Sequence, residues 1–507
     1  MNRDSLGTIV SSIDGPSPSV LSFVVNEGKV HKGMFIELEY SEGTMVCLVE
    51  DVVKTNRYFE RPDSVKTIGA ELEKNFPVSD WEFLLGRARP LGVFVESNGN
   101  IQRSTFPPSP GTKVFKAKDE NLKKFLALQE NGLHLGSINF HDVLMKVNLS
   151  KLLQKHLAIL AMSGAGKSYC VSVLLEELLL REKENGQIAV IVFDTHGEYT
   201  CFGESAKSPH KDFSSVTKVI DASKIKIASS KLTPGMIANI MPDLSAPQKR
   251  ELSSIISRLS NEMKSGVGPF DLASVRAELS SSQNQKTAET LLGILSELED
   301  LELFSKIDYP AVSDIARPGQ LCVLDLSKII SDKKKQIIVS YFSNKLFNDR
   351  RQKRIPPFAL FVEEAHNFIP ETTSKGVAIA KSTLRTIARE GRKFGAALVV
   401  ISQRPKRLDT TTLANCNTNI ILRITNPYDL DHIKQSSEGL DQASINSISS
   451  LRVGEALIVG EAVGAPTFFR VRLRTSQPSK HEVTLEEAAK RFSEQKEKNE
   501  DEINSFL

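Results

Sequence analysis

Residues 157–180, LAILAMSGAGKSYCVSVLLEELLL, restrict the fold of this 507-residue chain more than any other segment. An apolar strand, a loop with two glycines, a Lys-Ser pair and an apolar helix follow one another, which is the context that a phosphate-binding loop requires. Gly164 and Gly166 can take backbone conformations that other residues avoid. The first glycine usual in such a loop is Ala161 here, and alanine fits that position if its φ angle is negative.

The loop is predicted to bind ATP. Its amides and the helix N-terminus point at phosphate oxygens, Lys167 places a positive charge near the β- and γ-phosphates, and the Ser168 hydroxyl can bind Mg²⁺. A chance glycine turn before a core helix is the alternative, and the full combination of features weakens it. The residues predicted to contact the nucleotide are Ser163, Gly164, Ala165, Gly166, Lys167, Ser168 and Tyr169.

A second apolar strand, in FALFVEEAHNF at residues 358–368, ends in two adjacent acids, Glu363 and Glu364. Burying two like charges is costly unless something neutralises them, and Mg²⁺ with an attacking water would do so. We assign Glu363 to the Mg²⁺ shell and Glu364 to orienting and polarising the water. The alternative is an exposed strand end with two solvated glutamates.

Two further strand ends carry candidate residues. In VIVFDTHGEY, residues 190–199, Asp194 is expected near the nucleotide and its Mg²⁺, because ligands of open α/β folds bind at the carboxyl edge of the sheet. His196 and Glu198 either contact substrate or cap a turn. Gln403, in VVISQRP, is predicted to sense the γ-phosphate by hydrogen bonding, and the alternative is an ordinary strand-end amide.

The phrase LRTIAREGRKFG, residues 384–395, places Arg385, Arg389 and Arg392 on one face of a predicted helix. Most basic helix faces are only solvated. In a ring NTPase, however, such an arginine can reach the γ-phosphate from a neighbouring subunit, which is worth ~10³–10⁵ in rate. Arg389 is our first candidate for this role and Arg392 the second.

The rest of the chain predicts an α/β core with two additions. Residues 1 to about 145 are rich in short strands, with a hairpin signal at Asn98-Gly99, and predict a small barrel or sandwich. From about 150, apolar strands alternate with helices, which indicates a mainly parallel sheet. A capping box from Ser245 to Gln248 begins a helical bundle. The predicted parts are a barrel at 1–148, the core at 149–232 and 307–475, the bundle at 233–306 and a C-terminal helical arm at 476–507.

Composition adds few restrictions. No apolar run approaches the ~20 residues of a membrane span, and the N-terminus lacks a signal-peptide layout. Five scattered cysteines without metal-ligand spacing are expected to be reduced thiols of a cytoplasmic protein. The net charge of +3 neither requires nor excludes nucleic acid, since a DNA channel needs local charge.

Five phrases, in this order, resemble the HerA family of archaeal hexameric DNA translocases, in the FtsK/HerA branch of the RecA-like ATPases: KHLAILAMSGAGKS, VFDTHGEY, FVEEAHNFIP, AREGRKFG and ISQRP. The resemblance implies a RecA-like P-loop core with an N-terminal HAS-barrel and a helical insertion. It also implies a homohexamer that uses ATP to drive double-stranded DNA through a central pore, and the nuclease NurA as a partner in DNA end resection during double-strand break repair, docked on the barrel.

The sequence departs from the family pattern at one further position of possible function, and it leaves other functions open. The family often has an arginine where this chain has Lys155, and lysine keeps the charge of a trans-acting residue but loses its planar fork. Lys375 is a candidate DNA-contacting pore residue or else a solvated loop lysine. The same ATPase residues also fit a ring that threads proteins or serves a secretion apparatus, and a scaffold whose ATP site only gates assembly.

Overall fold

The computed structural model describes residues 4–11, 15–26, 29–56, 59, 66, 81–95, 100–232, 236–237, 240–241, 244–282, 284–372, 378–437, 439–479, 486, 489–490 and 492. By its internal packing the chain forms two units. The first comprises residues 1–152, 157–170 and 416–473, and the second comprises residues 153–156, 171–415 and 474–507. The division cuts across the sequence because strands distant along the chain pair within each unit.

The N-terminal part of the first unit is a closed β-barrel. Six strands pair in the order β2-β1-β7-β3-β4-β5, and β5 pairs back with β2, so the sheet has no open edge there; β6 extends it beside β5. The barrel interior is filled by alternating apolar side chains such as Phe23, Ile36 and Met45. The strands are β1 (Gly7–Val10), β2 (Leu21–Val25), β3 (Phe35–Tyr40), β4 (Gly43–Asn56), β5 (Glu82–Val95), β6 (Ile101–Gln102) and β7 (Lys113–Lys116).

The predicted small barrel or sandwich is therefore a barrel. The predicted turn at Asn98-Gly99 lies outside the described residues, but the strands that flank it, β5 and β6, pair antiparallel.

The rest of the first unit is a mixed sheet in the order β10-β18-β19-β20-β8-β9. Its first two strands run parallel, and the following ones are antiparallel, including the hairpin of β19 and β20. The elements are α3 (Asp119–Phe125), β8 (Leu133–Ile138), β9 (Leu144–Val147), β10 (Leu157–Leu160), β18 (Thr418–Ile421), α14 (Pro427–Ser436), α15 (Gln442–Ile448), β19 (Glu455–Gly460) and β20 (Thr467–Val471); α4 (Leu149–Leu153) and α5 (Lys167–Leu179) cross from this unit into the second.

The second unit is built on a parallel sheet in the order β12-β15-β11-β16-β17. Its central strands are buried along their whole length, as their unbroken apolar sequences predict. Because the strands are parallel, their carboxyl ends meet at one edge. The strands are β11 (Ala189–Asp194), β12 (Thr217–Asp221), β15 (Leu321–Asp325), β16 (Phe358–Val362) and β17 (Ala396–Ser402), and the helices beside them are α10 (Val312–Ile315), α11 (Asp332–Arg351), α12 (Lys381–Phe394) and α13 (Thr410–Ala414).

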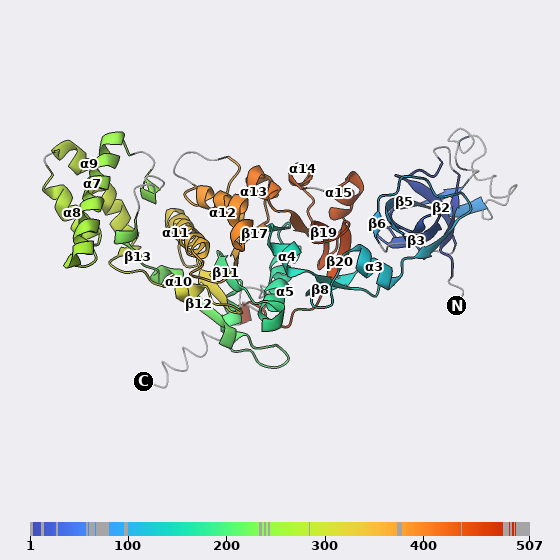
Figure 1. Cartoon of the computed structure of the whole chain (residues 1–507), viewed down its shortest axis with the longest axis horizontal. Helices are drawn as coiled ribbons and strands as arrows, with labels where there is room; N and C mark the ends of the chain where they lie inside the picture. The colour runs from blue at the N-terminus through green and yellow to red at the C-terminus, as the bar shows by residue number, and fades with distance from the viewer. Residues whose placement is uncertain are drawn as a thin grey trace. The chain divides into compact units, whose positions relative to one another are not determined.

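In the described part of the insertion between β12 and β15, three helices form a bundle (Figure 1). It comprises α7 (Ala246–Glu262), α8 (Leu272–Ser280) and α9 (Gln285–Asp300). The predicted capping box is confirmed, since Ser245 and Gln248 exchange hydrogen bonds between side chain and backbone. The bundle core is apolar, with buried Leu252, Ile255, Ile256 and Leu259 on α7 and buried Leu291, Leu295 and Leu298 on α9. The C-terminal arm predicted from residue 476 lies mostly outside the described residues.

Asp308 links the segments that lead into and out of the bundle to helix α11 beside the parallel sheet. Two short parallel strands, β13 (Ile227–Ala228) and β14 (Phe304–Ser305), lead into and out of the insertion. The Asp308 carboxylate accepts hydrogen bonds from the Ala228 N–H and the Tyr341 hydroxyl on α11, at 2.7 and 2.8 Å, and pairs with Lys231 and Lys345. Burial would raise the pKa of Asp308, but hydrogen bonds from Lys231 and Lys345 outweigh it and lower the pKa to about 2.

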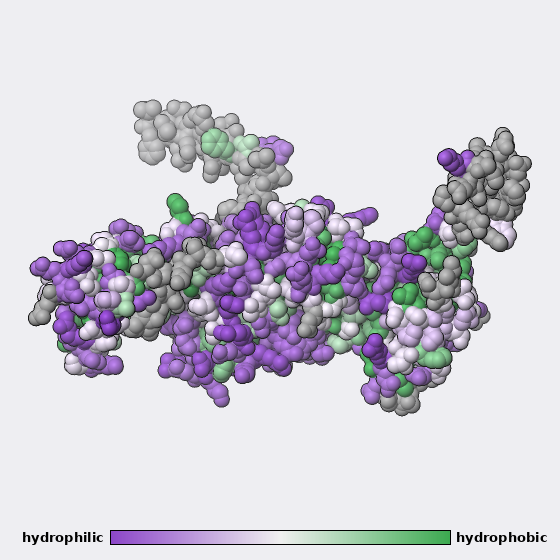
Figure 2. Space-filling view, turned by 90° about the horizontal axis from the view of Figure 1, so that it is seen from above, coloured by the Kyte–Doolittle hydropathy of each residue, from purple (hydrophilic) through white to green (hydrophobic). Residues whose placement is uncertain are grey.

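No helix in the described part of the chain is both long and apolar enough to cross a lipid bilayer. On the face seen in Figure 2, hydrophilic residues dominate the surface and hydrophobic ones form small separate patches. The five cysteines are buried and unpaired by disulfides, as their apolar sequence contexts predict.

We predict that Asp308→Asn destabilises the second unit by about 2 kcal/mol at neutral pH. Folding lowers the pKa of Asp308 from 3.8 to about 2, so the ionised form favours the folded state. The contribution is therefore present above about pH 4 and is lost as the pH falls towards 2. Denaturant unfolding at a series of pH values from 7 to 3 measures this, and the difference in unfolding free energy between wild type and variant should decrease as the pH falls. Asp314→Asn, in an exposed ion pair, is the matched control; an equal effect of both variants would contradict the prediction.

Candidate active site

The predicted phosphate loop connects β10 to α5 in the first unit. Gly164 and Gly166 have φ angles of +76° and +93°, which only glycine adopts without strain. Ala161 is buried and is not among the residues with positive φ, so the condition under which alanine can open the loop is met. The loop is anchored by hydrogen bonds from the Met162 N–H to the Arg423 carbonyl and from the Ala165 N–H to the Met162 carbonyl.

The described residues leave the backbone uncrowded at both glycines of the loop. A Cβ atom on Gly166 would lie 3.7–3.8 Å from Leu422, Val453 and Gly454, whereas a Cβ atom on Gly164 would meet nothing within 4 Å. Ser163 and Gly164 are exposed, and Lys167 at the start of α5 is largely buried. This open backbone before a helix N-terminus is an arrangement that binds phosphate.

In the second unit, Glu363 is fully buried just after β16. Its Oε2 atom accepts hydrogen bonds from the Thr195 N–H at 2.7 Å, the Thr195 hydroxyl at 2.8 Å and the His196 N–H at 3.2 Å. Its Oε1 atom lies 3.2 Å from Nδ1 of His196. These donors compensate the buried carboxylate for the loss of hydrogen bonds to water.

The adjacent Glu364 is also buried, but its contacts differ. Its Oε2 atom lies 3.2 Å from Nδ1 of His366. His366 belongs to the short helix η10 (Ala365–Asn367), which begins directly after Glu364. The backbone of Glu364 has φ +46° and ψ +46°, a left-handed conformation that is strained for glutamate. Such strain concentrates at functional positions. Each of the two neighbouring acids thus contacts a different histidine.

Asp194 organises the loop that supplies the donors to Glu363. Its two carboxylate oxygens accept hydrogen bonds from the N–H groups of Gly197, Glu198 and Tyr199, at 2.8–3.0 Å. Burial, followed by the charge of Glu363, raises the pKa of Asp194 well above its usual range. The hydrogen bond to Glu363 raises the pKa of His196. Direct contact of Asp194 with a nucleotide stays a prediction.

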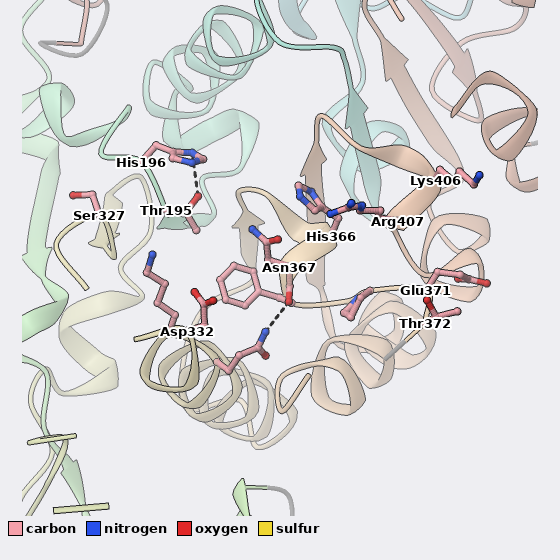
Figure 3. Close-up of a pocket in the computed structure, with 14 residues that line it drawn as sticks. Thr195, His196, Ser327, Asp332, His366, Asn367, Glu371, Thr372, Lys406 and Arg407 are labelled. Carbon is pink, nitrogen blue, oxygen red and sulfur yellow. Dashed lines mark hydrogen bonds between the residues drawn. The ribbon is translucent and has the colours of Figure 1, made fainter. Parts of the chain in front are cut away.

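A cavity of about 1230 Å³ opens beside these groups, at the carboxyl edge of the parallel sheet (Figure 3). His196 and Thr195 reach it from the loop after β11, and His366 and Asn367 from the segment after β16. Basic and acidic side chains both line it. They are Lys335, Lys406, Arg407, Asp332 and Glu371.

The acid pair suits Mg²⁺. Oxygen atoms of Glu363 and Glu364 and a nitrogen of His196 lie within 4.8 Å of one another, and carboxylate oxygens are the ligands that Mg²⁺ prefers. Most of the Oε2 capacity of Glu363 is used by Thr195 and His196, so Oε1 is the atom with capacity for a cation or its water.

The three candidate arginines of α12 fall into two groups. Arg385 is held within the subunit, because its guanidinium pairs with Asp409 and donates to the Thr411 hydroxyl. Arg389 and Arg392 are exposed, and the side chain of neither has a hydrogen bond or an ion pair to another described residue. They are therefore available to an external group, as Arg385 is not.

The remaining predicted residues are placed as follows. Gln403 directly follows β17 and is half-buried. Lys155 is also half-buried, and its neighbour His156 accepts a hydrogen bond from the Leu398 N–H at 3.0 Å. Burial lowers the pKa of His156 to about 4, which keeps it neutral for this role. Lys375 lies outside the described residues.

Sequence reasoning did not identify Thr195, His366 or Ser402. Thr195 was contained in the phrase that gave Asp194 and His196, and His366 in the phrase that gave the two acids. A hydroxyl beside a strand-end acid was the available signal, but the pairing of Thr195 with Glu363 joins residues 168 positions apart.

Comparison with known proteins identifies close resemblances over nearly the whole length. The family model described as "Helicase HerA, central domain" matches residues 133–346. A probable helicase of Methanocaldococcus jannaschii is 30% identical over 477 residues, which cover 89% of this chain and 88% of that protein. The DNA double-strand break repair helicase HerA of Sulfurisphaera tokodaii is 26% identical over 520 residues, covering 98% and 99%.

Among solved structures, VirB4 of Thermoanaerobacter pseudethanolicus superposes with a TM-score of 0.50 at 19% identity, covering 68% of this chain and 97% of VirB4. This likeness shows the P-loop ATPase fold and nothing further, because the sequence identity is low.

Proposed function

The chain belongs to the HerA helicase family, and from that premise we propose that it is a ring-forming motor that uses ATP to move double-stranded DNA through a central pore. As a member of that family it is an ATP-hydrolysing enzyme. The observation that carries the proposal is the buried acid pair, in which each carboxylate contacts different residues and can perform a different task.

The roles of the two acids follow from these partners. Glu363 is fixed by Thr195 and His196, which suits a group that must stay in one place to hold a cation. Glu364 lacks those donors and is assigned to the attacking water, whose proton a carboxylate can accept. We assign Ser168 and Glu363 to Mg²⁺, which when bound supplies positive charge to the β- and γ-phosphates. Lys167 adds charge from the phosphate loop, and Gln403 is assigned to sensing the γ-phosphate.

The neighbouring subunit of a homohexamer is proposed to complete each site through Arg389, with Arg392 or Lys155 as the alternatives. The exposure of the first two supports this, because an arginine already paired within its own subunit is poorly placed to reach another. Loss of the γ-phosphate contact would change the subunit interface and shift pore loops along the DNA backbone. Lys375 remains a proposed pore residue.

The biological setting is proposed from relatives. Several are named DNA double-strand break repair helicases, which supports a role in double-strand break repair. Within that role we propose DNA end resection, with the NurA nuclease docked on the barrel of residues 1–148. A ring that threads proteins has the same ATPase requirements, but the relatives' names favour DNA.

We predict that double-stranded DNA stimulates ATP hydrolysis and that Lys167→Ala reduces hydrolysis to background with or without DNA. Lysine is the phosphate loop's only side-chain cation, so its loss removes the charge at the β- and γ-phosphates. Steady-state ATPase assays on material of measured oligomer mass test this, with Lys264→Ala on the inserted bundle as the matched control. ATPase activity indifferent to DNA would favour the protein-threading alternative, and full activity of Lys167→Ala would refute the site.

We also predict that Arg389→Ala and Lys167→Ala subunits, each inactive alone, regain activity when mixed. A mixed ring contains some interfaces with an intact loop on one side and an intact Arg389 on the other. ATPase activity is measured across mixing ratios after subunit exchange. If no ratio restores activity, Arg389 does not act in trans, and the same experiment with Arg392→Ala then tests the second candidate.

A further inference from the structure

The segment after β16 turns His366 back towards the acid that precedes it. Glu364 takes the left-handed conformation, and the Asn367 N–H donates to the Glu364 carbonyl at 2.8 Å, which closes a tight turn. As a result, Nδ1 of His366 lies 3.2 Å from the Glu364 carboxylate. Both side chains are almost inaccessible, with 8% and 3% of their surfaces exposed. The left-handed backbone at Glu364 therefore brings the side chains of His366 and Glu364 into contact.

The same nitrogen of His366 also lies 3.1 Å from the Ser402 hydroxyl at the end of β17. Ser402 is fully buried, and its Oγ accepts a hydrogen bond from the Arg404 N–H at 3.0 Å. The strands β16 and β17 pair in parallel with Val362 opposite Val400, so Glu364 and Ser402 stand at the same level two residues further on. His366 thus joins two strand ends.

Nδ1 of His366 lies close to two groups at once. It is 3.2 Å from Oε2 of Glu364, an ion-pair contact in which Oε2 receives no hydrogen bond from the described residues, and it is within hydrogen-bonding distance of the Ser402 hydroxyl. The bond to Ser402 fixes the imidazole ring against the Glu364 carboxylate, so the ring limits the directions that this carboxylate can take.

We propose that His366, anchored by Ser402, is a positioning residue that holds the Glu364 carboxylate in the orientation needed to activate water, and that it ties this carboxylate to the strand end that bears Gln403. The inference rests on the proposed function of Glu364.

The test compares kcat with KM for ATP in His366→Ala, His366→Asn and Ser402→Ala. We expect His366→Ala to lower kcat about 10- to 100-fold, the usual cost of losing a group that orients a catalytic ligand, with KM for ATP nearly unchanged. His366→Asn should recover much of kcat, because the Asn amide can donate from near the Nδ1 position. Ser402→Ala should have a smaller effect of the same kind. His210→Ala, at an exposed turn, is the matched control and should behave as wild type.

Glu364→Gln serves as the reference that separates the two hypotheses. If Glu364→Gln hydrolyses ATP normally, the proposed function of Glu364 fails. If Glu364→Gln is inactive while His366→Ala keeps the wild-type kcat, the positioning role is overturned. The same holds if the kcat of His366→Asn is no higher than that of His366→Ala. Thermal unfolding accompanies each variant, and if His366→Ala does not fold, the Asn and Ser402 variants decide the question by the same kcat criterion.

Discussion

Two adjacent glutamates buried at the end of one strand are the constraint on which the second unit depends. A single unpaired carboxylate in such a place costs several kcal/mol, and two neighbouring ones repel each other as well. The backbone of Glu364 takes a left-handed conformation, and as a result the two side chains contact different residues. Glu363 receives donors from the loop after β11, and Glu364 meets His366. Around them, Asp194 fixes the loop that carries Thr195.

The sequence was sufficient to predict the features that depend on local pattern. The phosphate loop, the capping box at Ser245 and the strand ending in two acids are each encoded within a few residues. Contacts between distant strands were not predictable in the same way, since nothing in the phrase ISQRP indicates that Ser402 meets His366. The arginine phrase illustrates both cases, because helical spacing correctly placed three arginines on α12 but could not reveal that Asp409 holds Arg385.

Exposure separates residues that serve the subunit from those available to a partner. The carboxylates of the acid site and Thr195 are buried, whereas Arg389 and Arg392 are exposed on α12, and their side chains have no partner among the described residues. A ring-shaped motor needs both kinds of residue, because ATP hydrolysis in one subunit must change the contacts of the neighbouring subunit. The barrel and the inserted bundle add surfaces to this core without contributing to the acid pair itself.

The division of labour between the acids is tested most directly by single-turnover cleavage of bound ATP in Glu363→Gln and Glu364→Gln, each measured across a range of Mg²⁺ concentrations. We expect raised Mg²⁺ to restore part of the cleavage rate of Glu363→Gln, because its defect is weaker cation binding, and to leave Glu364→Gln slow at saturation. Equal Mg²⁺ dependence of the two variants, or rescue of Glu364→Gln alone, would contradict the account.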